Sequence, residues 1–416
     1  MELLTIVTLL IVLTAVFGYI NVRFLKLPVT IGLMLVSIGF SVIMLAIGFI
    51  NPSILSYEKQ LVLSIDFHEV LMDGMLSLLL FAGALHVDFG KLKTWQGPIL
   101  TFATIGVLIS TLVVGGFTWG LLQIFGHEVA LIYCLLFGAL ISPTDPIAAL
   151  GILKKLGVPK KLEIKIVGES LLNDGIGVVV FLTLYQIAQI GVDQVDPSAI
   201  GLLFLQEVGG GILLGLVLGY VAFHMMRSID NYEVEIMITL AIVMGGYLLA
   251  STWHVSGPLA MVVAGLMIGN ESFRSTTMSD ETRLYVDKFW EIIDVLLNAL
   301  LFVVIGLEIV VLEFEPFYFL AGLCAIPIVL LARLAGLALP IGIFSRRLEF
   351  EPNTTMIMTW GGLRGGISIA LALSLTSDMP RDLILAVTYC VVAFSIIVQG
   401  LTIDPFIRRL QGSPAN

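Results

Sequence analysis

Ile141-Ser142-Pro143-Thr144-Asp145-Pro146 interrupts one apolar run of this sequence, and Gly168-Glu169-Ser170-Leu171-Leu172-Asn173-Asp174-Gly175 opens the next. Carboxyl, hydroxyl and amide side chains therefore fall inside segments whose other residues suit a lipid environment. An ionisable side chain at membrane depth costs roughly 2.5 to 3.5 kcal/mol on insertion scales, and such residues usually mark ion or proton pathways. We therefore expect these two stretches to form the functional site and the other apolar runs to form its scaffold.

The composition indicates a polytopic, all-α membrane protein. Of the 416 residues, 58% are hydrophobic and 12% are charged, whereas soluble domains have about 25% charged residues. We expect one membrane domain over residues 1–412, embedded in the lipid bilayer, because no stretch is long and polar enough for a soluble domain. The net charge of -10 argues against a nucleic-acid partner. The sequence contains no Gly-x-x-x-x-Gly-Lys-Ser/Thr motif, and we expect no cofactor.

Apolar runs bounded by charges, proline or glycine predict about 13 transmembrane helices. The predicted spans are 3–22, 28–50, 68–87, 98–124, 129–151, 165–190, 200–225, 233–252, 256–270, 290–312, 317–343, 354–376 and 382–407.

The distribution of basic residues predicts the orientation of these spans. Lysine and arginine gather in every second connection, including the cluster Lys154, Lys155, Lys160, Lys161 and Lys165, and the pairs Arg346, Arg347 and Arg408, Arg409. By the positive-inside rule, the N-terminus lies outside and the C-terminus lies in the cytoplasm. The predicted location is the inner or plasma membrane.

Thirteen spans in this orientation form two six-helix halves of opposite topology around a linker span. Span five then corresponds to span twelve, which carries Gly361-Gly362-Leu363-Arg364-Gly365-Gly366. Both spans contain a strong break in helix-forming sequence, and paired interrupted helices in corresponding positions indicate the midplane site of a secondary transporter. The sequence thus predicts an inverted-repeat antiporter fold with two interrupted, crossing helices.

The first break has two interpretations. Pro143 and Pro146 remove backbone donors and leave carbonyl groups without their helical partners. A proline kink stabilised by Thr144 would explain the prolines alone. Asp145 between them favours a functional break that lines a wet cavity.

The polar residues of span six predict an ion site. Ser170 and Asp174 are four residues apart and share one helical face, with Asn173 beside them and Glu169 one turn from Asn173. A carboxylate and a hydroxyl suit a hard monovalent cation, and the same carboxylate can take a proton. The alternative is a polar network that only packs helices together.

Arg364 in span twelve needs an anionic partner. We expect Glu169 to be this partner in a structural ion pair, with Asp145 as the rival. Asn173 and Thr144 are expected to hold the crossing of the broken helices by hydrogen bonds.

These motifs, together with the stretch from Phe289-Trp290-Glu291 to Gly306, resemble the electroneutral sodium/proton exchangers of the cation:proton antiporter-1 family (NhaP/NHE-like). The resemblance implies an elevator-like homodimer. Its transport unit would comprise residues 98–190 and 317–410, and its dimerisation or scaffold unit residues 3–90 and 200–312.

The resemblance also implies residue roles. Asp174 would bind a cation (Na⁺, also Li⁺) or a proton in competition, with oxygens from Ser170 and Thr144 as further Na⁺ ligands and Asp145 acting near the site. Asn173, Glu169 and Arg364 would support the site. Electrogenic relatives have Asp-Asp and a nearby lysine, so Asn173-Asp174 with Arg364 implies exchange of one cation for one proton.

Two other spans contain candidate residues. Some relatives use an acidic ligand from span three, but here the similar stretch is Leu80-Phe81-Ala82-Gly83-Ala84, and Asp73 and Asp88 are displaced to opposite ends. Span three is therefore left out of the predicted site. Glu291, Asp294 and Asn298 of span ten either line a cytoplasmic funnel or form an ordinary interfacial helix start.

Three other functions compete with a sodium/proton antiporter. A K⁺/H⁺ exchanger would share the architecture. An intramembrane aspartyl protease would use Asp145 and Asp174 as a carboxylate pair, but the Gly-x-Gly-Asp signature is missing. A cation channel would need a carbonyl-ring filter, for which no motif is present. The predicted protein is thus a transporter and not an enzyme.

Overall fold

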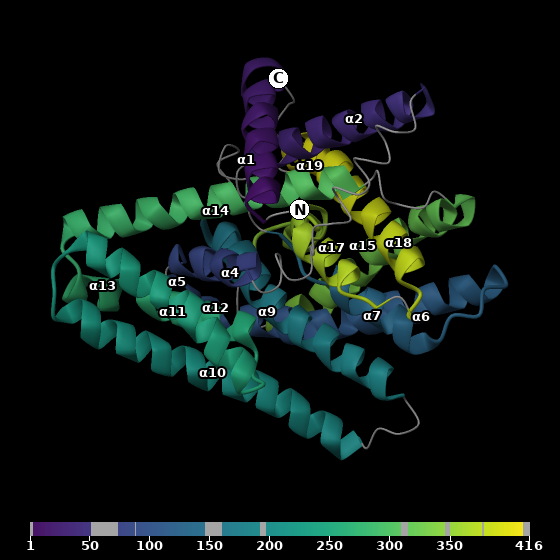
Figure 1. The fold of residues 1–416 in the computed structure, drawn as a ribbon. Helices are drawn as coiled ribbons and strands as arrows, with labels where there is room; N and C mark the ends of the chain where they lie inside the picture. The colour runs from purple at the N-terminus through teal and green to yellow at the C-terminus, as the bar shows by residue number, and fades with distance from the viewer. Residues whose placement is uncertain are drawn as a thin grey trace.

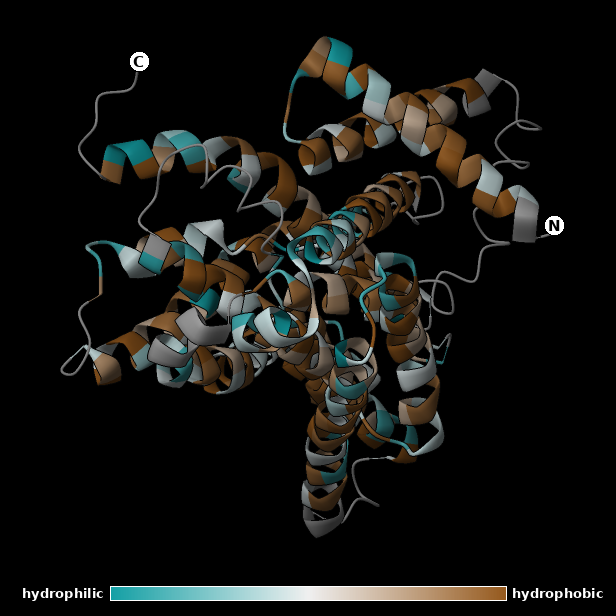
Figure 2. Cartoon of the chain, turned by 90° about the vertical axis from the view of Figure 1, so that its left-hand side faces the viewer, coloured by the Kyte–Doolittle hydropathy of each residue, from teal (hydrophilic) through white to brown (hydrophobic). Residues whose placement is uncertain are grey.

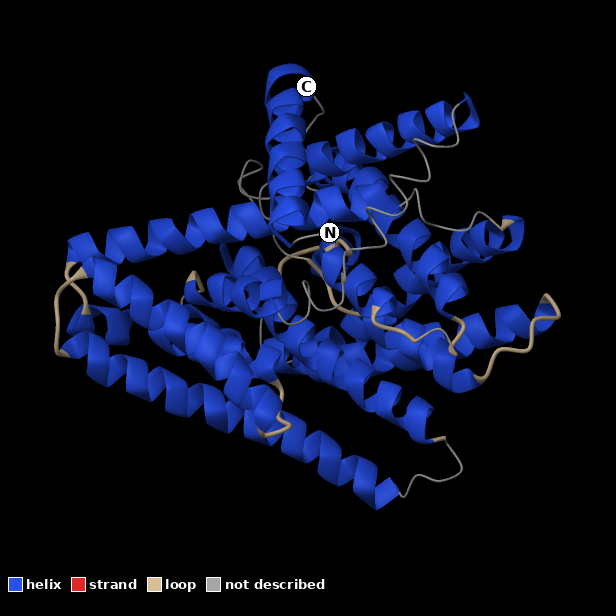
Figure 3. Ribbon diagram, viewed as in Figure 1, coloured by secondary structure: helices blue, strands red, loops and turns tan. Residues whose placement is uncertain are grey.

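The computed structural model describes residues 3–50, 74–87, 89–145, 160–191, 197–308, 315–345, 350–376 and 378–410. In these ranges the chain is entirely helical, with helices joined by turns and short loops (Figure 3). The predicted all-α class is therefore confirmed. Residues 146–151 of the predicted span 129–151, which include Pro146, lie outside the described residues, as do Asp73 and Asp88.

The helices follow the predicted apolar runs closely. They are α1 (Leu3–Ile20), α2 (Val29–Ile50), α4 (Leu76–Leu85), α5 (Phe89–Thr101), α6 (Val107–Ile124), α7 (Leu131–Ile141), α9 (Lys160–Ile190), α10 (Pro197–Arg227), α11 (Tyr232–Thr252), α12 (Gly257–Ile268), α13 (Glu271–Thr277), α14 (Asp280–Glu308), α15 (Pro316–Phe344), α16 (Thr354–Gly361), α17 (Gly366–Leu373), α18 (Arg381–Phe394) and α19 (Gly400–Leu410). Three π-helical turns, Asn21–Leu25, Phe102–Gly106 and Ser395–Gln399, continue α1, join α5 to α6 and join α18 to α19.

Among the described residues, nine helices are long and apolar enough to cross a membrane, or ten if α16 and α17 form one bent span. Three shorter apolar helices, α4, α7 and α12, accompany them. The count of 13 spans remains a prediction.

The surface is apolar where a soluble protein would be polar. Leu112, Phe117 and Leu248 are each more than 60% exposed, and apolar residues follow the helices while hydrophilic residues gather mainly at their ends and connections (Figure 2). Exposed apolar surface on this scale indicates contact with lipid.

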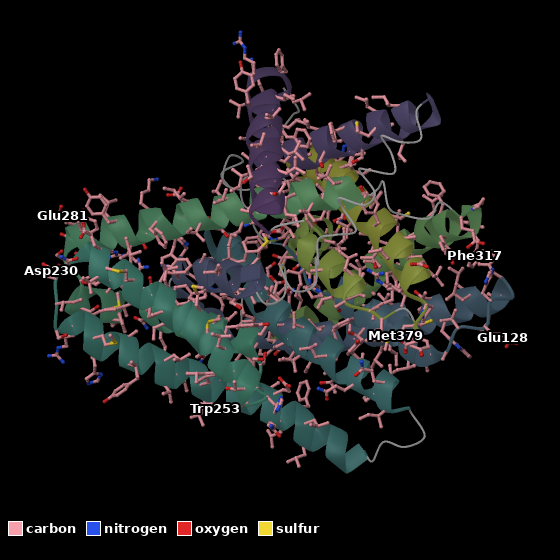
Figure 4. The ribbon with its side chains drawn as sticks, viewed as in Figure 1. Glu128, Asp230, Trp253, Glu281, Phe317 and Met379 are labelled. Atoms are coloured by element: carbon pink, nitrogen blue, oxygen red, sulfur yellow. The ribbon has the colours of Figure 1, made fainter. Side chains whose placement is uncertain are left out.

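Two pairs of connections lie at opposite ends of the molecule. Asp230 and Glu281 stand at one end, and Glu128 and Phe317 stand at the other (Figure 4). At the first end, Asp230 Oδ1 accepts hydrogen bonds from Ser279 Oγ at 2.8 Å and Thr282 Oγ1 at 3.0 Å. These bonds connect the α10–α11 turn to the start of α14 and lower the pKa of the Asp230 carboxyl.

The two predicted breaks meet at the centre of the molecule. Helix α7 ends at Ile141, and residues 142–145 are not helical. The second break separates α16 from α17, whose axes differ by 50°. The backbone N–H of Asp145 donates to the carbonyl oxygen of Leu363 at 2.7 Å, so backbone groups freed by one break satisfy those of the other. Helix α9 runs beside them, with α7 on one side and α12 on the other (Figure 1).

Candidate functional site

The site is built on one face of α9. Glu169 and Ser170 precede Asn173 and Asp174, respectively, by four residues, and a helix places such pairs on one side. All four are buried, with exposed fractions of 0 to 7%. This face of α9 meets the first break, where Gly177 allows close approach: a Cβ there would lie 2.5 Å from Pro143 Cγ.

Asn173 joins α9 to the first break. Its Nδ2 group donates to Thr144 Oγ1 at 2.9 Å and to Glu169 Oε1 at 2.6 Å, while its Oδ1 accepts from the Thr144 backbone N–H at 3.3 Å. The Thr144 and Ser170 hydroxyls lie 2.9 Å apart and share a hydrogen bond. The hydrogen bonds expected between Asn173 and Thr144 are thus present.

The predicted ion pair between Glu169 and Arg364 is wrong. Glu169 pairs with Arg333 of α15, whose NH1 and NH2 groups donate to Oε1 at 2.6 Å and Oε2 at 2.7 Å. Both side chains are buried. The sequence signal was an arginine within the apolar run 317–343, which the same argument about intramembrane charges would have identified.

Arg364 binds backbone carbonyl groups. Its NH1 group donates to the carbonyl oxygens of Ser142 and of Pro143, the latter at 2.9 Å. These carbonyls belong to the turn that the prolines remove from regular helix geometry, so the guanidinium satisfies acceptors that the break leaves open. The backbone N–H of Arg364 donates to Ser395 Oγ at 2.9 Å, which anchors the second break to the π-helical turn after α18.

Asp174 differs from the other three polar residues on this face of α9 in its hydrogen bonding. Within the described part of the chain, its carboxylate accepts no hydrogen bond and forms no ion pair, although the residue is only 7% exposed. It lines a cavity of about 70 Å³ together with Thr144, Asp145 and the start of α17. A cavity of this size has room for a few water molecules or a small ion.

The opposite wall of the cavity comes from α4 and α14. Leu79, Leu80 and Gly83 of α4 line it, as do Asn298 and Leu301 of α14. Span three therefore lines the cavity with apolar side chains. That it supplies no acidic ligand to the site remains a prediction.

The candidate residues of span ten, Glu291, Asp294 and Asn298, lie in different environments in the structure. Asn298 faces the cavity, and its Nδ2 group donates to Asp294 Oδ1 at 3.0 Å. Glu291 lies on the exposed surface, where Lys288 Nζ contacts its carboxylate at 2.7 Å. Asn298 thus belongs to the cavity wall and Glu291 to the surface.

This chain is similar to known proteins over most of its length. The family model described as "Sodium/hydrogen exchanger, transmembrane" matches residues 11–409. The chain is 51% identical over 413 residues to the Na⁺/H⁺ antiporter NhaP of Pseudomonas aeruginosa, covering 98% of this chain and 97% of that protein. It is 35% identical over 392 residues to the Na⁺/H⁺ antiporter NhaH of Halobacillus aidingensis, covering 93% of each.

A solved structure has the same fold. The sodium proton antiporter MjNhaP1 of Methanocaldococcus jannaschii superposes with a TM-score of 0.77 at 20% sequence identity, covering 99% of this chain and 100% of that one. The predicted antiporter fold is therefore confirmed.

Proposed function

We propose, because this chain belongs to the sodium/hydrogen exchanger family, that it exchanges a monovalent cation for H⁺ across the membrane by alternating access. Na⁺ is the proposed cation, with Li⁺ as a second substrate, and the similar proteins named above as Na⁺/H⁺ antiporters support this choice. The opposing ion gradient supplies the energy, and no cofactor takes part.

The observation that carries the proposal is the state of Asp174. A carboxylate that is buried and, within the described residues, has neither a hydrogen-bond donor nor an ion pair is strongly disfavoured as a free anion. A proton or a metal cation entering the cavity removes this cost, and one carboxylate cannot hold both fully. Asp174 therefore binds the two substrates in competition, which is the minimum requirement of an exchanger.

Oxygen atoms around Asp174 complete the proposed cation site. Ser170 and Thr144 supply hydroxyl oxygens, and Asp145 supplies a second carboxylate at the cavity wall. Asn173, Glu169, Arg333 and Arg364 hold these groups in place through the hydrogen bonds described above. The broken helices thus provide oxygen ligands and backbone carbonyls at the site, as discontinuous helices do in other secondary transporters.

The charges of the site support a one-to-one exchange. The residues of the proposed site carry two guanidinium groups, those of Arg333 and Arg364, and three carboxylates, those of Glu169, Asp174 and Asp145, which leaves one negative charge. One Na⁺ or one H⁺ neutralises it equally. The site therefore has the same net charge when it crosses the membrane with Na⁺ in one direction and with H⁺ in the other. No net charge moves in a full cycle, so we propose electroneutral exchange.

The cavity lies where the proposed moving parts would meet. Its wall on the α9 side comes from the predicted transport unit, and its α4 and α14 wall comes from the predicted scaffold unit. We propose that the first unit moves against the second, in a homodimer held by the scaffold unit. The proposed location is the cell membrane with the C-terminus in the cytoplasm, supported by the basic connections.

The other functions remain as outcomes of the test. A K⁺/H⁺ exchanger would use the same residues with a different cavity size. A protease that uses Asp145 and Asp174 would need room for a peptide, and a cavity of about 70 Å³ does not hold one.

The test measures proton flux in proteoliposomes that contain a pH dye, with Na⁺, Li⁺ or K⁺ added outside, at zero and at imposed membrane potential. We expect Na⁺-driven proton movement that is insensitive to potential, and its abolition in Asp174→Asn with folding retained. Asp382→Asn, at an exposed helix start, is the matched control. Robust exchange by Asp174→Asn would refute the site. Peptide cleavage by the wild type would indicate a protease in place of an antiporter, and cation flux without proton movement would indicate a channel.

A further inference from the structure

Helix α14 contributes a polar group to the cavity wall opposite Asp174. Asn298 is 6% exposed and lines the cavity with Asp145 and Asp174. Its neighbours on this wall are apolar, since Leu79, Leu80 and Leu301 surround it. A buried amide in apolar surroundings must have its polar atoms satisfied.

The hydrogen bonds of Asn298 determine which way the amide faces. Its Nδ2 group donates to the Asp294 carbonyl oxygen at 2.9 Å and to Asp294 Oδ1 at 3.0 Å. Both partners are acceptors, so the nitrogen must occupy this side of the amide. The Oδ1 atom is left for the cavity, and no described residue donates to it.

Asp294 strengthens this oxygen as a ligand. A carboxylate that accepts an N–H from an amide polarises the amide and raises the negative charge on its oxygen. Asp294 also lies one turn nearer the start of α14, where Glu281 marks the end of the molecule (Figure 4). The Asp294 carboxylate lies between that end and the cavity, and when ionised it favours the approach of cations.

We propose that the Asn298 amide oxygen is a cation ligand, contributed from α14 and oriented by Asp294. This inference rests on the proposed exchange function and adds a specificity-determining residue to it. Asn298 is a direct ligand to the ion, while Asp294 is a positioning residue that acts through it.

Because Asn298 lies on the proposed scaffold unit, this ligand is available only while the two units are docked as in this structure. Leu301, one turn further along α14, packs against the broken helix at Gly366, where an added Cβ would overlap the leucine side chain. The face of α14 that carries Asn298 therefore contacts the transport unit directly. Movement of that unit withdraws the ion from the amide oxygen and lowers the number of its ligands.

The test compares Asn298→Leu, which keeps the side-chain volume but removes the oxygen, with Asp294→Asn, which keeps an acceptor for the amide but removes the charge. Val295→Leu, on the exposed face of α14, is the control. We expect about a tenfold higher half-saturating Na⁺ concentration in Asn298→Leu, since hydrogen bonds or ligands to charged groups are worth about that much. We expect a two- to threefold rise in Asp294→Asn.

Two further readouts separate a ligand from a packing residue. Loss of a ligand changes the ratio of half-saturating Na⁺ to Li⁺, whereas a packing defect raises both concentrations together. Binding is also measured without transport, as the increase in melting temperature caused by NaCl relative to choline chloride. We expect a smaller increase in Asn298→Leu than in the wild type.

The inference is overturned if Asn298→Leu keeps the wild-type Na⁺ dependence in both assays, if its Na⁺ to Li⁺ ratio is unchanged, or if Asp294→Asn loses as much affinity as Asn298→Leu. In these cases wild-type exchange continues and the proposed function stands. If the wild type moves no protons with any cation, the proposed function fails, and the NaCl-dependent melting shift still decides whether Asn298 binds the ion.

Discussion

Replacing Arg333 with methionine should destabilise this protein far more than replacing Arg283, although both arginines form the same two-pronged ion pair. Arg333 contacts Glu169 at 2.6 and 2.7 Å, and Arg283 contacts Glu271 at 2.7 and 2.6 Å. The pairs differ in burial. The side chains of the first are 10% and 0% exposed, and those of the second are 37% and 60% exposed.

The expected magnitudes follow from this difference. Within the described residues, Arg333→Met leaves a fully buried carboxylate with the Asn173 amide as its remaining donor, and breaking one side of a buried pair costs about 3 to 5 kcal/mol. Arg283→Met removes a surface pair worth about 0 to 1 kcal/mol. In the double variant Glu169→Gln with Arg333→Met, a neutral amide replaces the stranded charge, so the double variant should lose less stability than the two single variants together.

The assay is thermal unfolding of the purified protein in detergent, at one pH and salt concentration for all variants. We expect a large fall in melting temperature for Arg333→Met, little change for Arg283→Met and partial recovery in the double variant. Equal melting temperatures for Arg333→Met and Arg283→Met would refute the reasoning, because geometry and not burial would then set the strength of the pair. Additive losses in the double variant would show that Glu169 and Arg333 are not coupled.

Two further variants test the break and the pH response. Gly177→Ala places a methyl group 2.5 Å from Pro143 Cγ, so exchange should fall and the free energy of unfolding should fall by about 1 to 3 kcal/mol. The control Gly116→Ala, with no neighbour within 4 Å, should not reduce stability in thermal unfolding. Equal melting temperatures of the two variants would contradict this contact. Hydrogen bonds from two hydroxyls lower the pKa of Asp230, so its contribution to stability is present above the unfolded pKa of about 3.9 and is lost only as the pH falls through the lower folded value. The melting difference between Asp230→Asn and the wild type should therefore be the same at pH 6 and pH 8, and a difference that changes over this range would show that Asp230 titrates there.

Local patterns in the sequence were sufficient for much of the site. The positions of Ser170, Asn173 and Asp174 on one face follow from the helical repeat alone. The break at Pro143 follows from the chemistry of proline, and the arrangement of Thr144 beside α9 follows from an amide and a hydroxyl that must satisfy each other at membrane depth. Apolar runs likewise predicted where most of the helices lie, although α14 begins at Asp280 and not at residue 290.

The sequence did not predict which residues form ion pairs and hydrogen bonds with Glu169 and Arg364. Glu169 and Arg364 were expected to pair because Arg364 lies within an apolar span and needs an anion there, yet the packing of α15 brings Arg333 to Glu169, and Arg364 turns to the carbonyls of the first break. The carbonyls were known to need donors, but nothing in the sequence showed which donor reaches them. The place of Asn298 on the cavity wall likewise depends on how α14 packs.

The sequence by itself determined that this is an all-helical membrane protein with charged side chains at two helix breaks, because hydrophobicity, helical periodicity and proline chemistry act over neighbouring residues. Only the tertiary structure decided which charges pair, that Asp174 alone in its cluster on α9 faces the cavity unpaired within the described residues, and that α4 and α14 close the opposite wall. These outcomes depend on distances between segments far apart in the chain, which the packing of side chains sets and local sequence does not encode.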